Sequence, residues 1–225
     1  MNTVIILPVS SALYQQLHSI HERMNADKKK SLSDEAGQLV SALACRLIDD
    51  IFGELILSLK AHDETVRLDD SLKTIAEVKT VLNKYLPWAT GFFGNERLLP
   101  VVTYYISLFR AKTDPNDGLD HHLSIDLPAD LAQQMNQSLA DLESGQTSDI
   151  DAALELLIQV IDHSLKPMLH HPKSLLKFNF VADKTLGGVI NVTSTLSYRN
   201  IRKLNRQLQP HLHAPLARHL KQFIH

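Results

Sequence analysis

The chain has 225 residues and a formal net charge of −2, and its 44% apolar and 21% charged residues are typical of a globular protein that can bury a core. Cys45 is the only cysteine, which excludes an internal disulfide and fits a reducing compartment. The sequence has no run of about 18–20 apolar residues and no basic start followed by a long apolar segment, so we expect a cytoplasmic protein with no membrane partner.

The first half of the chain alternates one short strand with helices. Residues 3–7 (TVIIL) are rich in β-branched side chains and predict a buried strand that ends at Pro8. Apolar residues then recur every three or four positions, which predicts helices over 12–24, 34–61, 69–86 and 100–112. The segment 34–61 has the widest apolar surface, and we expect it to form the centre of the core.

The second half begins with another short strand, predicted over residues 123–127. Helical spacing predicts further helices over 128–142, 149–165, 199–209 and 215–224. The segments 176–181 and 189–198 are rich in strand formers, and Phe178 and Phe180 alternate with polar residues. With the glycine-containing segment 183–188 between them, they predict a β-hairpin.

These elements predict a mainly α fold of the α+β class. We expect a helical bundle-like domain with a small β component, made of a short N-terminal strand and a C-terminal β-hairpin. One compact domain over residues 1–225 is the simplest organisation. The turn residues of Asp114–Gly118 offer a possible subdivision into a neutral helical part (1–113) and a charge-segregated part (114–225).

Charge is strongly segregated along the chain. Residues 113–162 carry eleven carboxylates and no lysine or arginine, whereas residues 163–225 carry ten basic residues and a single acid, Asp183. The residues before 113 hold thirteen basic and thirteen acidic side chains and are neutral. Complementary charge of this kind steers association and fixes its register, so the pattern favours self-association or docking of a protein partner.

The basic segment contains the residues that we predict to bind an anion or a partner: Arg199, Arg202, Lys203, Arg206, Arg218 and Lys221. The first four are spaced so that they share one face of a helix. Such a face would bind phosphates and release counterions, which makes nucleic-acid binding the first alternative function. A structural alternative is that the basic face pairs with the acidic segment of the same or a neighbouring chain.

Aromatic residues are concentrated in residues 85–109, which hold seven of the chain's aromatic side chains. These side chains form either an ordinary aromatic core or the lining of a pocket for an apolar ligand. A pocket would make the protein a binder of small apolar ligands or an enzyme, which is the second alternative function. The predicted pocket residues are Trp88, Phe92, Phe93, Tyr104 and Tyr105.

Signatures of catalysis and metal binding are absent from the sequence. No nucleophile elbow, phosphate-binding loop or dinucleotide fingerprint occurs. Imidazole and carboxylate side chains together could bind a transition metal, but the twelve histidines match neither an HExxH motif nor a paired CxxC site. The pair His62-Asp63 is compatible with metal-dependent phosphohydrolases and also with an ordinary polar helix end. We therefore expect a non-enzymatic interaction or regulatory protein, without catalytic residues, metal or cofactor.

Overall fold

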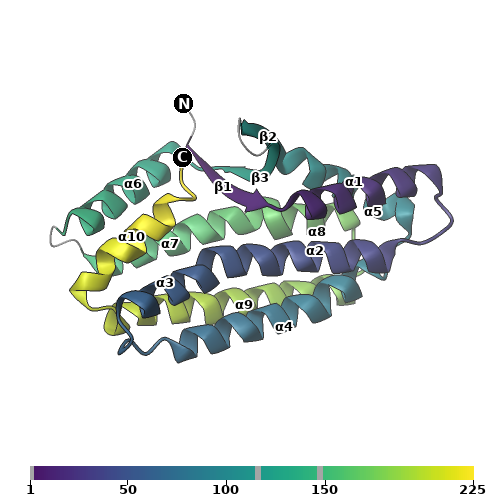
Figure 1. Cartoon of the computed structure of the whole chain (residues 1–225). Helices are drawn as coiled ribbons and strands as arrows, with labels where there is room; N and C mark the ends of the chain where they lie inside the picture. Colours follow the sequence, from purple (N-terminus) through teal and green to yellow (C-terminus); the bar gives the residue numbers. More distant parts are fainter. Residues whose placement is uncertain (1–2, 115–117, 146–148) are drawn as a thin grey trace.

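The computed structural model describes residues 3–114, 118–145 and 149–225 (Figure 1). The described α-helices are α1 (Ser11–Ala26), α2 (Ser33–Ile48), α3 (Glu54–His62), α4 (Asp69–Thr90), α5 (Asn95–Leu108), α6 (Ala129–Ser144), α7 (Ile150–Leu165), α8 (His171–Leu176), α9 (Phe180–Gln207) and α10 (His213–Lys221). The strands are β1 (Val4–Val9), β2 (Phe109–Asp114) and β3 (Gly118–Asp126). Two π-helical turns, η1 (Asp49–Gly53) and η2 (Lys166–His170), and one 3-10 turn, η3 (Pro210–Leu212), complete the fold. The prediction of a mainly α fold with a minor β component is confirmed.

The small sheet joins the two ends of the chain. Its strand order is β1-β3-β2 and both pairings are antiparallel, with Ile5 opposite Ile125 and Leu7 opposite Leu123. These four side chains are buried, as alternation along a half-buried strand requires. At the outer edge of β1 the backbone of Val4 exchanges hydrogen bonds of 2.8 and 2.9 Å with that of His225, which brings the two termini together (Figure 1).

Both strands predicted at residues 3–7 and 123–127 are present. The helix predicted to reach residue 112 instead ends at Leu108, and β2 follows at once. Pairing with β3 overrides the helix-forming character of Arg110, Ala111 and Lys112. The predicted subdivision at Asp114–Gly118 depends on residues 115–117, which lie outside the described residues.

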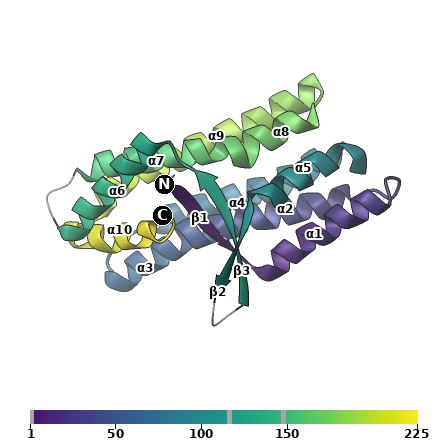
Figure 2. The same cartoon turned by 90° about the horizontal axis from the view of Figure 1, so that it is seen from above.

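The bundle is built around α2, η1 and α3, which form one continuous helical segment over the range predicted as 34–61. Helix α4 packs along α2, and α9 lies beside α4 and α7 (Figures 1 and 2). Gly37 is required at the α2–α4 contact, because a Cβ atom there would lie 2.6 Å from the Cα atom of Pro87. One cluster of buried apolar side chains extends from β1 through the bundle to α10.

The predicted C-terminal β-hairpin is wrong, because its residues belong to α8 and to the long helix α9. Lys177 has a left-handed conformation (φ 48°) that ends α8, and the side chain of Asn179 caps α9 by accepting a hydrogen bond from the Ala182 backbone at 2.9 Å. The glycines expected to form a turn, Gly187 and Gly188, lie inside α9. Packing against α4 and α7 overrides the strand propensity of this segment.

His213, at the start of α10, gives the fold a predicted pH dependence. Its Nε2 atom is buried and has no hydrogen-bond partner among the described residues. Burial lowers the pKa of this imidazole below 6.5; a hydrogen bond with the Leu208 backbone opposes the shift, and nearby His211 adds to it. The unfolded chain therefore binds a proton more readily than the folded chain, and the free energy of unfolding should fall as the pH drops below about 6.5.

His213→Gln should reduce that fall in stability. The measurement is urea unfolding of wild type and variant at about pH 8 and about pH 5.5, above the titration of ordinary carboxylates. The exposed residue His170, changed to glutamine, is the matched control and should leave the wild-type difference unchanged. An equal loss of stability between about pH 8 and about pH 5.5 in wild type and in His213→Gln would show that His213 is not the cause of the pH dependence.

Candidate functional site: an apolar cavity in the helical bundle

The four predicted basic residues of α9 share one exposed helical face, as their spacing indicates, but one of them pairs with an acidic residue of the same chain. Arg199, Arg202, Lys203 and Arg206 are exposed on α9. Arg202 binds Glu155 of α7 through two hydrogen bonds, Nε–Oε1 at 2.5 Å and Nη2–Oε2 at 3.0 Å, and this contact lowers the pKa of Glu155.

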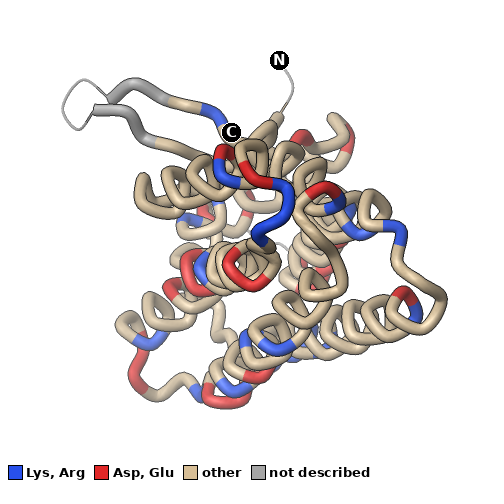
Figure 3. The backbone as a smooth tube through the Cα atoms, turned by 90° about the vertical axis from the view of Figure 1, so that its right-hand side faces the viewer, with Lys and Arg blue, Asp and Glu red and all other residues tan. Residues whose placement is uncertain are grey.

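The acidic and basic segments of the sequence also meet at α10. There Lys221 Nζ lies 2.5 Å from Oε2 of Glu143, while Arg218 donates to the Ala214 carbonyl at 3.4 Å. Seen from one end of the bundle, acidic and basic residues are interspersed (Figure 3). Folding therefore brings part of the segregated charge into intramolecular pairs.

The predicted aromatic residues are distributed over two environments. Trp88 and Phe92 contact each other with ring centroids 4.8 Å apart, and they are 39% and 51% exposed. Phe93 is buried against Phe178, and the Tyr104 hydroxyl donates to the Pro167 carbonyl at 3.0 Å. Of the five, Tyr105 alone lines the cavities described below.

The histidines do not form a metal-ligand cluster in the described ranges, where no three histidine, cysteine or acidic side chains come together. His62 contacts the Ser58 carbonyl, whereas Asp63 accepts hydrogen bonds from the backbone and hydroxyl of Thr65. These bonds are the main reason why the pKa of Asp63 is lowered. His211 lies 3.1 Å from the same carboxylate.

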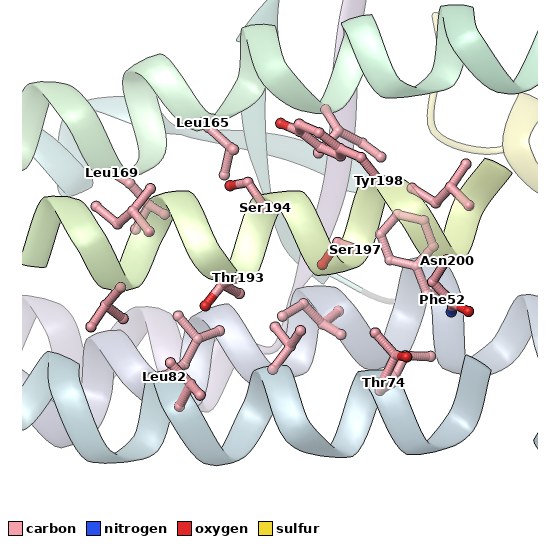
Figure 4. A pocket seen from close by; sticks show the side chains of 18 of the residues that line it. Phe52, Thr74, Leu82, Leu165, Leu169, Thr193, Ser194, Ser197, Tyr198 and Asn200 are labelled. Carbon is pink, nitrogen blue, oxygen red and sulfur yellow. The ribbon is translucent and has the colours of Figure 1, made fainter. Parts of the chain in front are cut away.

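Two adjoining apolar cavities lie inside the bundle. The first, here called the outer cavity, lies between α4, α7, α9 and the η1–α3 segment and has a volume of about 190 Å³ (Figure 4). The second, the inner cavity, lies between α2, α7, the sheet and α10 and has a volume of about 200 Å³. Each exceeds the roughly 150 Å³ of an apolar protein cavity that takes up a benzene molecule.

A common apolar wall connects the two cavities. Six residues line both of them: Ile48, Phe52, Leu82, Ile161, Leu165 and Leu169. All six are only half-buried, although they belong to the interior faces of the bundle helices. The apolar surface of these side chains is thus not fully covered by protein, and a molecule that removed it from water would gain about 25 cal/mol per Å².

The two π-helical turns flank this wall. Phe52 belongs to η1 and Leu169 to η2, and both side chains line both cavities. Pro167 lies in η2 and has no backbone N–H, so the regular α-helical hydrogen bond cannot form at this position. Single π-helical turns within long helices are frequent at functional sites.

A groove between α4 and α9 adjoins the outer cavity. Six residues line both the groove and the outer cavity: Thr74, Val78, Val81, Tyr85, Val189 and Thr193. The outer rim of the groove carries Val192 and Leu196, which are 59% and 44% exposed, together with Gly188. Glu77 and Thr185 also line the groove, which is otherwise mostly apolar.

No protein-family model, curated protein or solved structure matches this chain. Within the described ranges, none of the helices combines the length and the apolar character needed to cross a membrane.

Sequence reasoning missed most of the residues that line the cavities. A usable signal was present in α9, where the cavity-lining residues recur at spacings of three and four: Leu186, Ile190, Thr193, Ser197, Ile201 and Leu204. That periodicity predicts one helix through the segment interpreted as a hairpin. Threonine and serine interrupt the apolar stripe of α9, so its helical periodicity is not evident from the apolar residues alone.

Proposed function

We propose that this protein binds an apolar small molecule inside its helical bundle. The observation that carries the proposal is the pair of adjoining apolar cavities, which share six half-buried side chains, the outer one also adjoining the α4–α9 groove. This is the apolar-ligand alternative of the sequence analysis, with the site moved from the aromatic segment to the bundle interior. Largely apolar concave sites with a few polar groups are typical of small-molecule binding.

Binding of an uncharged fluorescent probe, N-phenylnaphthylamine, tests the proposal. Its fluorescence should rise in the presence of the full-length protein, and dodecanol should displace it. Dodecanol at about 100 times its Kd should also stabilise the folded protein by about 2.7 kcal/mol, measured by urea unfolding at constant ligand concentration. Absence of both probe binding and stabilisation would overturn the proposal.

Gly188→Phe should slow ligand entry with little effect on the fold. Gly188 lies at the groove and a Cβ atom added there meets nothing within 4 Å, so a phenyl ring can occupy the approach. Replacing a glycine inside a helix by phenylalanine also recovers part of the glycine penalty, which is about 1 kcal/mol relative to alanine. We expect the association rate of N-phenylnaphthylamine, measured by stopped-flow fluorescence, to fall at least about fivefold, with the unfolding free energy unchanged or higher.

Gly187→Ala is the control for the change in helix propensity. Gly187 does not line the groove, and the Cβ atom of an alanine there would meet only the flexible Lys173 side chain at 3.3 Å. The Gly187→Ala variant should also gain helix stability, but it should keep the wild-type association rate of N-phenylnaphthylamine. Equal rates for wild type and Gly188→Phe would exclude the α4–α9 groove as the route of entry.

Docking through the basic face of α9 is a second proposal. It is supported by Arg199, Lys203 and Arg206, which are exposed and form no ion pair with a described side chain. Self-association or a protein partner is the first form of this proposal, and nucleic-acid binding is the other. Oligonucleotide anisotropy across a salt series separates them, because three phosphate contacts predict a log–log slope of about −2.7 on duplex DNA and a docked protein predicts no binding.

A further inference from the structure

The two cavities differ in what they offer a ligand. The inner cavity has two hydroxyl groups in its lining, and both are already used by the protein: Ser164 donates to the Val160 carbonyl at 2.8 Å and Tyr105 to the Met168 carbonyl at 2.7 Å. Its remaining lining is apolar. The inner cavity therefore suits a hydrocarbon chain.

The outer cavity contains an unsatisfied polar group. Ser71, in the first turn of α4, is 2% exposed and lines this cavity, and its hydroxyl has no hydrogen-bond partner among the described residues. A buried hydroxyl without a partner destabilises a protein by about 1–3 kcal/mol, so few remain unpaired in folded proteins. One turn along α4, Thr74 already donates to the Asp70 carbonyl at 2.9 Å.

Hydroxyl groups occur along the whole outer cavity. Thr74 of α4 and Asn200 of α9 lie at the same end as Phe52, whereas Thr193 of α9 lies with Leu82 and Leu169 toward the other end (Figure 4). Ser71 precedes Thr74 on α4 by three residues and so lies near the end that holds Thr74 and Asn200. The outer cavity thus has the unpaired Ser71 hydroxyl near one end, and the wall that it shares with the inner cavity is wholly apolar.

Charge is absent from both linings. Neither cavity is lined by a described aspartate, glutamate, lysine, arginine or histidine. Tyr198, in the outer cavity, stays neutral because burial, and then the nearby Asp162 carboxylate, raises its pKa to about 12. A carboxylate, phosphate or ammonium group of a ligand would therefore be buried without a countercharge, which is strongly unfavourable.

We infer that the ligand is an uncharged amphiphile, with a hydroxyl, ester or other neutral hydrogen-bonding group beside Ser71 and an aliphatic chain that passes Leu165 into the inner cavity. This inference rests on the proposed function and assigns the chemical class of the molecule bound. Ser71 is expected to recognise the polar group and the inner cavity to accept the chain.

A series of ligands with one chain length and different head groups tests the inference. Dodecanol and methyl dodecanoate are neutral, dodecanoate is an anion and dodecylamine is a cation at neutral pH. The neutral pair should displace N-phenylnaphthylamine from the full-length protein at least tenfold more tightly than the charged pair. Displacement by no member of the series would overturn the proposed function itself, whereas equal or tighter binding of a charged member would overturn only the head-group assignment.

Ser71→Ala separates recognition from a structural role. The variant should bind dodecanol about three- to tenfold more weakly, because one hydrogen bond is lost. Without ligand it should be at least as stable as wild type, since the unpaired hydroxyl has been removed. Ser107→Ala removes an exposed hydroxyl that donates to the Tyr104 carbonyl and lines neither cavity, so it should keep wild-type selectivity between dodecanol and dodecanoate. Unchanged dodecanol affinity in Ser71→Ala, or a loss of stability in its absence, would contradict the role of Ser71.

Discussion

Ala44→Leu is expected to raise the free energy of unfolding by about 1–2 kcal/mol and to weaken N-phenylnaphthylamine binding at least tenfold. Ala44 belongs to α2, is half-buried and lines the inner cavity. A leucine there adds three carbon atoms to the cavity, where they cover apolar surface that the wild-type protein leaves accessible. The same atoms occupy the space that we assign to the ligand chain, so stability and affinity should change in opposite directions.

The matched control lies two residues earlier on the same helix. Ala42 is exposed, and Ala42→Leu makes the same chemical change outside both cavities. We expect this variant to alter stability by no more than about 0.5 kcal/mol and to keep wild-type affinity. Urea unfolding and probe titration measure both properties. Tighter probe binding by Ala44→Leu, or a marked loss of stability, would show that the inner cavity is not the space that the ligand occupies.

Asn95→Ala is expected to lower the free energy of unfolding by about 2–4 kcal/mol. Asn95 is 1% exposed and holds the connection between α1 and α2. Its Oδ1 atom accepts a hydrogen bond from the Leu32 backbone at 2.9 Å, and its Nδ2 atom donates to the carbonyl groups of Asp27 and Lys30 at 2.8 and 2.7 Å. Alanine would remove all three bonds and leave the Leu32 N–H buried without a partner.

Two further variants show whether the amide itself is responsible. Asn95→Asp keeps an acceptor for the Leu32 N–H but places a carboxylate against two carbonyl oxygens, so it should not restore stability. Asn25→Ala removes an exposed asparagine in the last turn of α1 and should change stability by less than about 0.5 kcal/mol. Thermal or urea unfolding gives all three values, and a stable Asn95→Asp variant would refute the proposed donor role.

The cavity variants and the Asn95 variants address different parts of the molecule. Asn95 organises the end of the bundle where α1 meets α2, whereas Ala44 lies beside the cavities. Loss of probe binding in Ala44→Leu together with normal binding in a folded Asn95 variant would locate the ligand in the bundle interior. General loosening of the protein would instead affect probe binding in both.

Local sequence patterns were sufficient to predict those helices and strands whose apolar residues recur at a regular spacing. The β-branched residues of 3–7 predicted β1, and the uninterrupted stripe of residues 34–61 predicted the helical segment formed by α2, η1 and α3. In both, the residues that favour the element by their own conformational preference are also those that the core buries, so local and tertiary forces agree. The basic residues of α9 share an exposed helical face, as their spacing of three and four residues predicted.

Tertiary structure alone decided the elements in which local preference and packing disagree. Residues 109–112 favour helix but pair with β3, and residues 189–198 favour strand but pack as α9 against α4 and α7. The cavities belong to the same class of property, because a cavity is the space that side chains from distant segments leave between them. The sequence by itself therefore determined the fold class, the regular helices and the segregation of charge. Only the folded chain decided that Glu155 pairs with Arg202, and that Ser71 and Leu165 line one apolar cavity, since these contacts join residues far apart in the sequence.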